Sequence, residues 1–180
     1  MNFSSLLAII YVNFTIWFKK FFKLKVVPYK ALLNLTDLCN SRCNFCDIWK
    51  INPKNEINVD EIKKIFKSFN KHLYWLSLSG GEITLVKYYK EMIDKLIYEC
   101  KNIKILAFTT NALAVNRALE YALYAKKKGL DVLVTISLDG DQKVHDELRG
   151  IPGNYNKCLE LYNKLRELNI NCHFGISAVG

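Results

Sequence analysis

The sequence predicts an α/β fold in which about five parallel strands alternate with helices, preceded by one N-terminal helix. From residue 30 onward, apolar runs of strand length alternate with stretches whose apolar residues recur at helical spacing. Polar or glycine-rich motifs stand at the carboxyl ends of the first four strands, where the active-site loops of α/β barrels lie. With 51% hydrophobic residues in a chain of 180, one sizeable core can form. We therefore expect a single domain over residues 28–180, with its functional loops gathered at one end of the sheet.

The N-terminal segment, residues 1–27, is expected to form a helix with one strongly apolar face. Its large apolar residues recur at spacings of four and three. The lysines follow this apolar run, which is the reverse of the order in a secretory signal peptide. Three interpretations stay open: a helix packed on the domain, an interfacial membrane helix with lysines at its polar end, and a membrane span. The residues of the apolar face are Phe3, Leu7, Ile10, Phe14, Trp17 and Phe21.

The positive charge of the chain is concentrated near this helix. The formal net charge is +9, and five lysines contribute to it in a segment that contains no acidic residue. Elsewhere the two signs mix along helix faces, as on solvated surfaces. Nucleic acid is therefore not an expected partner. Peripheral membrane contact through residues 1–25 is left open. The five lysines are Lys19, Lys20, Lys23, Lys25 and Lys30.

The elements after residue 30 are bounded by turn and capping residues. Asn58, with Glu61 three residues on, is typical of a capping box at the start of the first helix of the domain. Gly129 is a typical terminating residue for a later helix, and a longer loop separates the fourth strand from the last helix. The expected strands are residues 31–35, 74–79, 103–108, 132–138 and 172–179, and the expected helices are about 58–69, 88–100, 116–128 and 155–168.

Three of the six cysteines, Cys39, Cys43 and Cys46, lie within eight residues in a loop just after the first strand. Thiolates are soft ligands that select iron–sulfur clusters, zinc or copper(I). No fourth ligand is evident nearby, although structural zinc requires four. Three thiols without a fourth suit a [4Fe–4S] cluster with one open iron, where a small molecule can bind. The other cysteines, expected to be buried packing residues, are Cys100, Cys158 and Cys172.

The cysteine spacing C-x3-C-x2-C, with the aromatic Phe45 before the last cysteine, is the first of four motifs in chain order. Together these motifs resemble those of the radical S-adenosylmethionine (SAM) superfamily, in the branch that often carries a C-terminal SPASM or twitch domain. The resemblance implies the partial TIM-like (β/α) barrel of the radical SAM core. Because only about five strands are present and the last would leave an open edge, we expect a chain truncated at its C-terminus. The other motifs are Ser79-Gly80-Gly81-Glu82, Ile136-Ser137-Leu138-Asp139-Gly140 and His145-Asp146-Glu147-Leu148-Arg149-Gly150.

The resemblance also implies roles for individual residues. The three cysteines would ligate three irons of a [4Fe–4S] cluster, whose fourth iron would chelate the amino and carboxylate groups of SAM. Gly80 and Gly81 would let the backbone approach the methionine moiety, and Glu82 would pair with its ammonium group. The chain departs from the family pattern at Ile83, where proline is usual, and at Ala112, where glycine is usual. The remaining cofactor-binding candidates, for which a turn or packing role is the alternative, are Phe45 near the adenine, Asn111 and Ser137 for the carboxylate or ribose, and Asp139 and Arg149 to order the closing loop.

The activity that the resemblance implies is reductive cleavage of SAM to a 5′-deoxyadenosyl radical, which abstracts hydrogen from a substrate. The expected partners are an electron donor such as flavodoxin or ferredoxin and a substrate that is a peptide, a cofactor precursor or a lipid. No catalytic residue is assigned. Two alternatives are a non-catalytic iron–sulfur-binding fragment and a membrane-associated structural protein. We expect a cytoplasmic location, with membrane association left open, because six cysteines without a secretory signature suit a reducing compartment.

Overall fold

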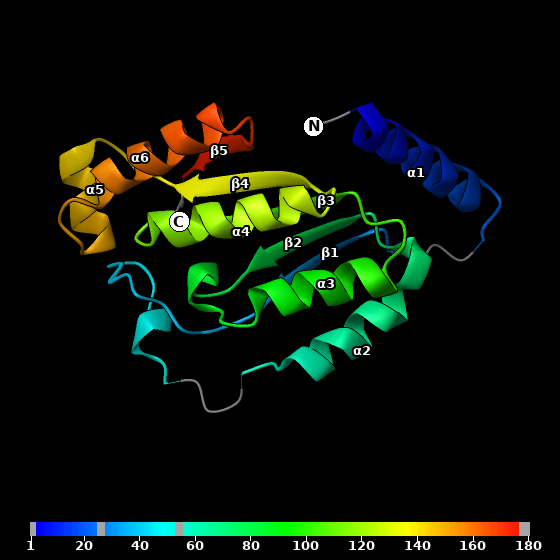
Figure 1. The fold of residues 1–180 in the computed structure, drawn as a ribbon, viewed down its shortest axis with the longest axis horizontal. Helices are drawn as coiled ribbons and strands as arrows, with labels where there is room; N and C mark the ends of the chain where they lie inside the picture. The colour runs from blue at the N-terminus through cyan, green and yellow to red at the C-terminus, as the bar shows by residue number, and fades with distance from the viewer. Residues whose placement is uncertain (1–2, 25–27, 53–55, 177–180) are drawn as a thin grey trace.

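The computed structural model describes residues 3–24, 28–52 and 56–176, which form a five-stranded sheet covered by helices (Figure 1). Every neighbouring strand pair is parallel, and the strands follow one another in sequence order across the sheet. This confirms the predicted βα rhythm. The strands are β1 (Lys30–Asn34), β2 (Trp75–Ser79), β3 (Ile105–Thr110), β4 (Asp131–Ser137) and β5 (Asn171–Gly175). The predicted continuation of the last strand to residue 179 lies partly outside the described residues.

Helices pack on one face of the sheet and enclose the hydrophobic core with it (Figure 1). The capping box of the first of them is confirmed, because Asn58 Oδ1 accepts a hydrogen bond from the backbone N–H of Glu61 and Glu61 Oε2 accepts one from that of Asn58. Gly129, with a φ of +88°, follows another helix as the sequence predicts. The core helices are α2 (Val59–Phe69), α3 (Tyr89–Glu99), α4 (Val115–Lys127) and α6 (Asn154–Glu167), and short 3-10 turns are η1 (Ile48–Lys50), η2 (Asn70–His72) and η3 (Ile83–Leu85).

Helix α5 (Gln142–Arg149) corrects the sequence prediction, which placed a long loop between the fourth strand and the last helix. Asp141 caps its start by accepting a hydrogen bond from the Val144 N–H at 3.0 Å, and Gly150 ends it with a φ of +65°. Its buried residues are His145 and Arg149, which are polar. Hydrophobic periodicity could not reveal this helix because polar side chains occupy its inward face.

The two faces of the sheet differ in character. On the face that the helices cover, the central strands bury apolar residues, as in the alternation of β2, where Leu76 and Leu78 are 1% exposed. At matching positions on the opposite face, one residue from each strand contributes a polar side chain to a row across the whole sheet. This polar row consists of Asn34, Ser79, Thr109, Thr135 and His173.

Helix α1 (Phe3–Phe21) lies beside the amino ends of the strands (Figure 1). Its buried residues are Ser5 and Val12, whereas the apolar face identified in the sequence is exposed to solvent, with Phe14 62% and Phe21 70% exposed. The helix therefore packs on the domain with the side opposite to its most apolar one. No helix among the described residues combines the length and the hydropathy of a membrane span. The predicted boundary after residue 27 lies outside the described residues.

Candidate functional site

A cavity of about 200 Å³ lies at the carboxyl ends of the strands. A larger hollow of about 530 Å³ lies at the amino ends of β2 to β5, but the three clustered thiols line the smaller one. Every proposed site residue except Asp139 lines this cavity, namely Cys39, Cys43, Phe45, Cys46, Gly80, Gly81, Glu82, Asn111, Ser137 and Arg149. Residues that the sequence analysis did not propose also line it, namely Ser41, Ile48, Ser79, Thr109 and Thr110.

The turn after β2 holds the cysteine loop from one side. The Gly81 N–H donates to the carbonyl of Thr36 at 2.7 Å, and the Glu82 N–H donates to that of Leu38 at 2.8 Å. A Cβ on Gly80 would lie 2.4 Å from the Thr36 carbonyl oxygen, and one on Gly81 would lie 2.2 Å from that of Leu38. The packing of the cysteine loop on this turn therefore requires both glycines. This reason differs from the close approach to a ligand on which the sequence interpretation was based.

The end of α5 holds the same loop from the other side. The Arg42 N–H donates to the carbonyl of Arg149 at 3.0 Å, and the Asn44 N–H donates to that of Leu148 at 2.9 Å. A Cβ on Gly150 would lie 2.6 Å from the Arg42 carbonyl oxygen, so a glycine is needed here as well. Two motifs that are far apart in the sequence thus brace one loop.

Glu82 is a buried carboxylate, 1% exposed, rather than a solvated residue after a turn. Its Oε1 accepts hydrogen bonds from the Thr84 N–H at 3.1 Å, the Thr84 hydroxyl at 2.7 Å and the Thr110 hydroxyl at 2.7 Å. Its Oε2 accepts one from the Asn111 N–H at 2.7 Å. A carboxylate has about four acceptor positions, two on each oxygen. Among the described residues Oε2 therefore keeps an acceptor position for a further donor.

The turn after β3 connects the cavity wall to the cysteine loop. Ala112 has a φ of +61°, a left-handed conformation that costs a non-glycine residue about 1–2 kcal/mol. The Thr110 hydroxyl supports it by accepting a hydrogen bond from the Ala112 N–H at 3.1 Å. The departure from glycine at this position therefore leaves the turn in place. The Asn111 side-chain amide donates to Asn40 Oδ1 at 2.8 Å and lies 3.9 Å from Cys39 Sγ.

Asp139 lies outside the cavity and acts on it through Arg149. The guanidinium donates from Nε and Nη2 to the two carboxylate oxygens of Asp139, at 2.5 and 2.9 Å. Its Nη1 lies 3.7 Å from Cys43 Sγ, and its central carbon lies 5.4 Å from the centre of the Phe45 ring. Burial opposes the charge of Arg149, but the ion pair outweighs it and raises its pKa above the ordinary value.

The model of the radical SAM superfamily matches residues 33–179. The chain belongs to the radical SAM superfamily. The sporulation killing factor maturation protein SkfB of Bacillus subtilis is 29% identical over 146 residues, which cover 80% of this chain and 34% of SkfB. The GTP 3′,8-cyclase of Aquifex aeolicus is 33% identical over 125 residues, which cover 65% of this chain and 39% of the cyclase. The chain therefore spans well under half the length of these radical SAM relatives.

Solved structures confirm the predicted fold, the partial TIM-like barrel of the radical SAM core. Streptococcus suis SuiB, solved with the precursor peptide SuiA, superposes with a TM-score of 0.69 at 19% identity. The superposition covers 88% of this chain and 35% of SuiB. Native anSMEcpe with bound AdoMet (SAM) superposes with a TM-score of 0.65 at 19% identity. The superposition covers 81% of this chain and 43% of anSMEcpe.

Radical SAM proteins use a [4Fe–4S] cluster and SAM, and the side chains of this cavity fit that pair. Within residues 3–24, 28–52 and 56–176, no three His, Cys, Asp or Glu side chains already surround an ion-sized position. The side chains fit the cluster because of the kind of ligand atoms that they offer. Three thiols of one loop line the cavity, and the carboxylate nearest to them in the lining, Glu82, is engaged in hydrogen bonds. Soft donors with an open fourth position suit an iron–sulfur cluster that also binds a small molecule.

All six cysteines of this radical SAM chain are free thiols. Burial raises the pKa of Cys39, and the neighbouring Glu82 carboxylate and cysteines add to the effect, while the backbone of Ser41 opposes it. Cys100 and Cys158 are fully buried, as the sequence analysis expected, and burial raises their pKa to about 11 and about 12. Cys172 is half-buried.

A buried network behind the cavity was missed by sequence reasoning. His145 Nδ1 accepts a hydrogen bond from the Asp139 N–H at 3.2 Å, and its Nε2 faces Asn154 Oδ1 at 3.1 Å, so the proton belongs on Nε2. Asn154 in turn donates to the Asn111 carbonyl at 2.9 Å. Burial lowers the pKa of His145, which favours the neutral ring. The histidine stood out in its motif, but Asn154 has no signal in the sequence because its partners come from other elements.

Proposed function

We propose that this chain is the cluster- and SAM-binding core of a radical SAM enzyme. One observation carries the proposal: three thiols, a buried carboxylate and a guanidinium, predicted from separate motifs, line a single cavity. When bound, the cluster would reduce SAM and generate a 5′-deoxyadenosyl radical that abstracts hydrogen from a substrate.

The residues of the cavity would divide the binding work among them. Cys39, Cys43 and Cys46 would anchor the cluster. Glu82 Oε2 would accept a hydrogen bond from the SAM ammonium group, because it has the acceptor position described above. Arg149, as a buried cation in the lining, would attract the SAM carboxylate. The second set of candidates, which would shape the adenine and ribose subsites, is Phe45, Asn111 and Ser137.

We infer that the substrate is a peptide. Two relatives support this class: SkfB is a maturation protein for a killing factor, and SuiB is solved with a precursor peptide. The polar row of the sheet adds physical support, because it carries hydrogen-bonding groups such as the Thr135 hydroxyl, 3.0 Å from His173 Nε2, that could pair with peptide amides. The GTP 3′,8-cyclases among the relatives make a nucleotide the second candidate. Stimulation of SAM cleavage by a precursor peptide encoded beside the gene, but not by GTP, would support the peptide class.

We also propose a small reduced protein, a flavodoxin or ferredoxin, as electron donor, and a cytoplasmic location. The six free thiols support a reducing compartment. If either reduced protein is the donor, it should support SAM cleavage in place of the chemical reductant dithionite. Failure of both, while dithionite works, would contradict the donor assignment alone.

The test of the central proposal is anaerobic reconstitution with iron and sulfide, followed by titration with SAM. We expect one [4Fe–4S] cluster per chain, a spectral change on adding SAM, and release of 5′-deoxyadenosine under a strong reductant. The triple variant Cys39→Ala, Cys43→Ala, Cys46→Ala should lose the iron, and Cys100→Ala should keep it. Iron retained by the triple variant at the same stoichiometry would overturn the site.

A non-catalytic iron–sulfur fragment is the second candidate. A stable cluster that binds SAM but releases no 5′-deoxyadenosine would establish this alternative.

A further inference from the structure

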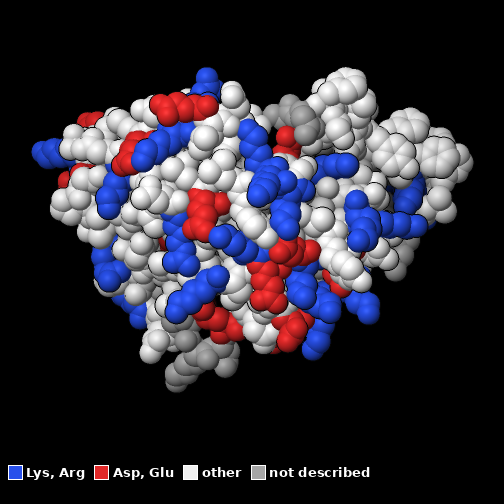
Figure 2. Space-filling model, viewed as in Figure 1, with Lys and Arg blue, Asp and Glu red and all other residues white. Residues whose placement is uncertain are grey.

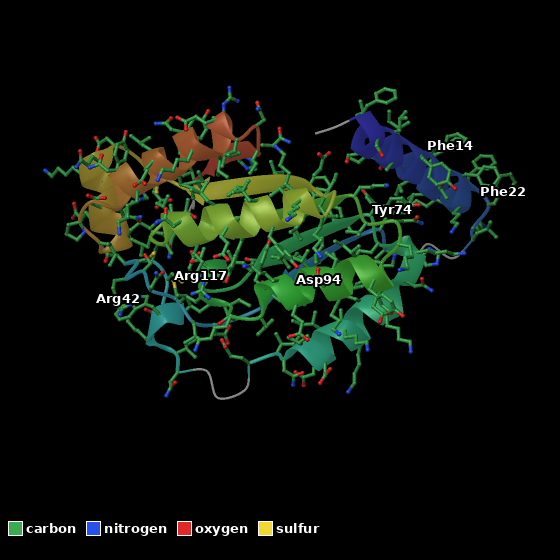
Figure 3. The ribbon with its side chains drawn as sticks, in the orientation of Figure 1. Phe14, Phe22, Arg42, Tyr74, Asp94 and Arg117 are labelled. Carbon is green, nitrogen blue, oxygen red and sulfur yellow. The ribbon has the colours of Figure 1, made fainter. Side chains whose placement is uncertain are left out.

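The outward face of helix α1 is a surface that the proposed function does not use. Phe14, Trp17 and Phe21 form a ladder along it, with successive ring centres 6.1 and 5.8 Å apart. These side chains are 62%, 61% and 70% exposed. Figure 3 shows Phe14 and Phe22 pointing away from the domain, whereas Tyr74 lies on the domain side of the helix. Contiguous exposed apolar surface of this kind marks an interaction site.

Positive charge lies along the domain side of α1 and at its C-terminal end. A groove of about 310 Å³ separates α1 from the loops before the strands, and Lys19, Lys71 and His72 line it. None of its described lining residues is acidic. Figure 2 shows α1 as a largely white surface with blue lysines at its C-terminal end. The first acidic residue of the chain is Asp37. Lysines are therefore the only charged side chains in the helix and in the segment that follows it up to residue 36.

We propose that α1 binds the surface of an anionic lipid bilayer. Phe14, Trp17 and Phe21 would enter the boundary between headgroups and acyl chains, where aromatic side chains concentrate. The lysines at the C-terminal end of the helix, Lys19, Lys20 and Lys23, would meet the lipid phosphates.

Charge complementarity favours a bilayer over a second copy of this chain. A dimer with the two α1 helices parallel would bring the same lysines of two chains near one another, and like charges oppose such contact. An antiparallel dimer would leave these lysines without an anionic partner, because α1 contains no acidic residue. An anionic bilayer replaces this repulsion with attraction. The helix does not need to be released for binding, because its apolar face already points outward while Val12 stays buried against the domain.

The position of α1 also sets the orientation on the membrane. The residues that α1 faces across its groove, Tyr29, Tyr74 and Asn102, come just before β1, β2 and β3. The cavity lies at the opposite, carboxyl ends of the strands. A molecule bound through α1 would therefore turn its cavity away from the bilayer, toward substrate arriving from water.

The test is flotation of the full chain with vesicles of phosphatidylcholine mixed with phosphatidylglycerol, and with vesicles of phosphatidylcholine alone. We expect strong binding to the mixed vesicles that weakens with salt. Phe14→Ser and Trp17→Ser should each weaken binding about tenfold or more, since each removes a large apolar side chain that the bilayer would bury. The matched control is Tyr98→Ser, because Tyr98 on α3 is also exposed, at 67%, and lies away from α1.

The charge contribution is tested separately. Replacing Lys19, Lys20 and Lys23 by Gln should weaken binding to the mixed vesicles by about fivefold for each lysine. The control variant carries the same charge change elsewhere in the chain, at Lys64, Lys87 and Lys143, which are exposed. Equal losses in both variants would mean that net charge, and not this helix, attracts the protein.

Quenching by brominated lipids reports the orientation. Tryptophan fluorescence should be quenched on binding, and Trp17→Phe should remove the quenching while Trp49→Phe retains it, because Trp49 lies beside the cysteine loop at the far end. No flotation of the wild type, or equal flotation of Phe14→Ser and Tyr98→Ser, would overturn the proposal. A dimer that becomes monomeric in Phe14→Ser, without flotation, would assign α1 to self-association. None of these measurements needs the cluster, so their failure would leave the proposed function untouched.

Discussion

Asp139 holds Arg149 in a two-point ion pair, with Nε–Oδ2 and Nη2–Oδ1 distances of 2.5 and 2.9 Å. The carboxylate side chain is 2% exposed and the guanidinium side chain 7%, so water screens this pair little. The third guanidinium nitrogen is thereby placed 3.7 Å from Cys43 Sγ. One residue outside the cavity thus sets the position of a cation inside it.

Removing this carboxylate should be costly. Asp139→Ala leaves a buried guanidinium without its partner, and we expect the free energy of unfolding to fall by about 3–5 kcal/mol. Chemical denaturation measures it. The control is Glu160→Ala, which breaks the exposed Lys164–Glu160 pair and should cost less than about 1 kcal/mol. Equal effects of the two variants would contradict the positioning role of Asp139.

The glycines after β2 should be intolerant of a methyl group. In Gly81→Ala the new Cβ would meet the Leu38 carbonyl oxygen, so the cysteine loop must shift. We expect a loss of about 1–3 kcal/mol in stability and less iron per folded chain after reconstitution. Gly129→Ala is the control: it has a φ of +88° but nothing within 4 Å, so it should cost about 1 kcal/mol and keep its iron. Normal iron content in Gly81→Ala would refute this account of the turn.

Glu82→Gln should weaken SAM binding about tenfold to a hundredfold, since a charge-assisted hydrogen bond contributes about 1.5–3 kcal/mol. Because Glu82 is buried, the change should also destabilise the fold. Thr84→Val separates the two effects, because it removes a hydroxyl that donates to Glu82 and leaves the carboxylate charge. Titration of SAM against the cluster spectrum, with unfolding measured in parallel, gives both quantities. Equal SAM affinity of Glu82→Gln and wild type would remove Glu82 from the cofactor site.

His145 should make the fold sensitive to mild acid. Burial lowers its folded-state pKa below the ordinary 6.5, so the unfolded chain takes up a proton more readily than the folded one. The neutral ring's contribution to stability is therefore present above about pH 6.5 and is lost as the pH falls below that value. His145→Gln can keep both hydrogen bonds without titrating, so its stability should fall less between about pH 7 and pH 5. Parallel pH profiles of unfolding for the two proteins would contradict this role.

Ala112→Gly should be nearly neutral. Relief of the left-handed strain contributes about 1–2 kcal/mol, but loss of a buried methyl and the added freedom of the unfolded chain cost about 0.8 and about 0.5–1 kcal/mol. We expect a net change within about 1 kcal/mol. Ala112→Val, a larger and β-branched residue at the same buried position, should destabilise by more than about 2 kcal/mol. Thermal unfolding compares them, and a tolerated valine would show that the turn relaxes.

Much of the fold and most of the candidate site could be predicted from local patterns. Apolar runs marked the strands, because the strand side chains that face the helices must be apolar to form the core. Once the strands were known to be parallel, their carboxyl ends had to share one edge of the sheet. That geometry brings Cys39, Glu82, Asn111 and Ser137 together from the ends of four separate strands, and they do line one cavity.

The sequence by itself thus determined the alternation of parallel strands with helices, the cysteine loop and the edge of the sheet where the site forms. Only the tertiary structure decided why Gly80 and Gly81 are needed, since the atoms that exclude a Cβ belong to a loop some forty residues earlier. It also decided that α5 is a helix and that Asn154 connects His145 to Asn111. For α1 it decided that Ser5 and Val12 pack on the domain while Phe14 and Phe21 stay exposed. The physical reason is common to all of these: each depends on contacts between segments far apart in the chain, which periodicity and local propensity do not record.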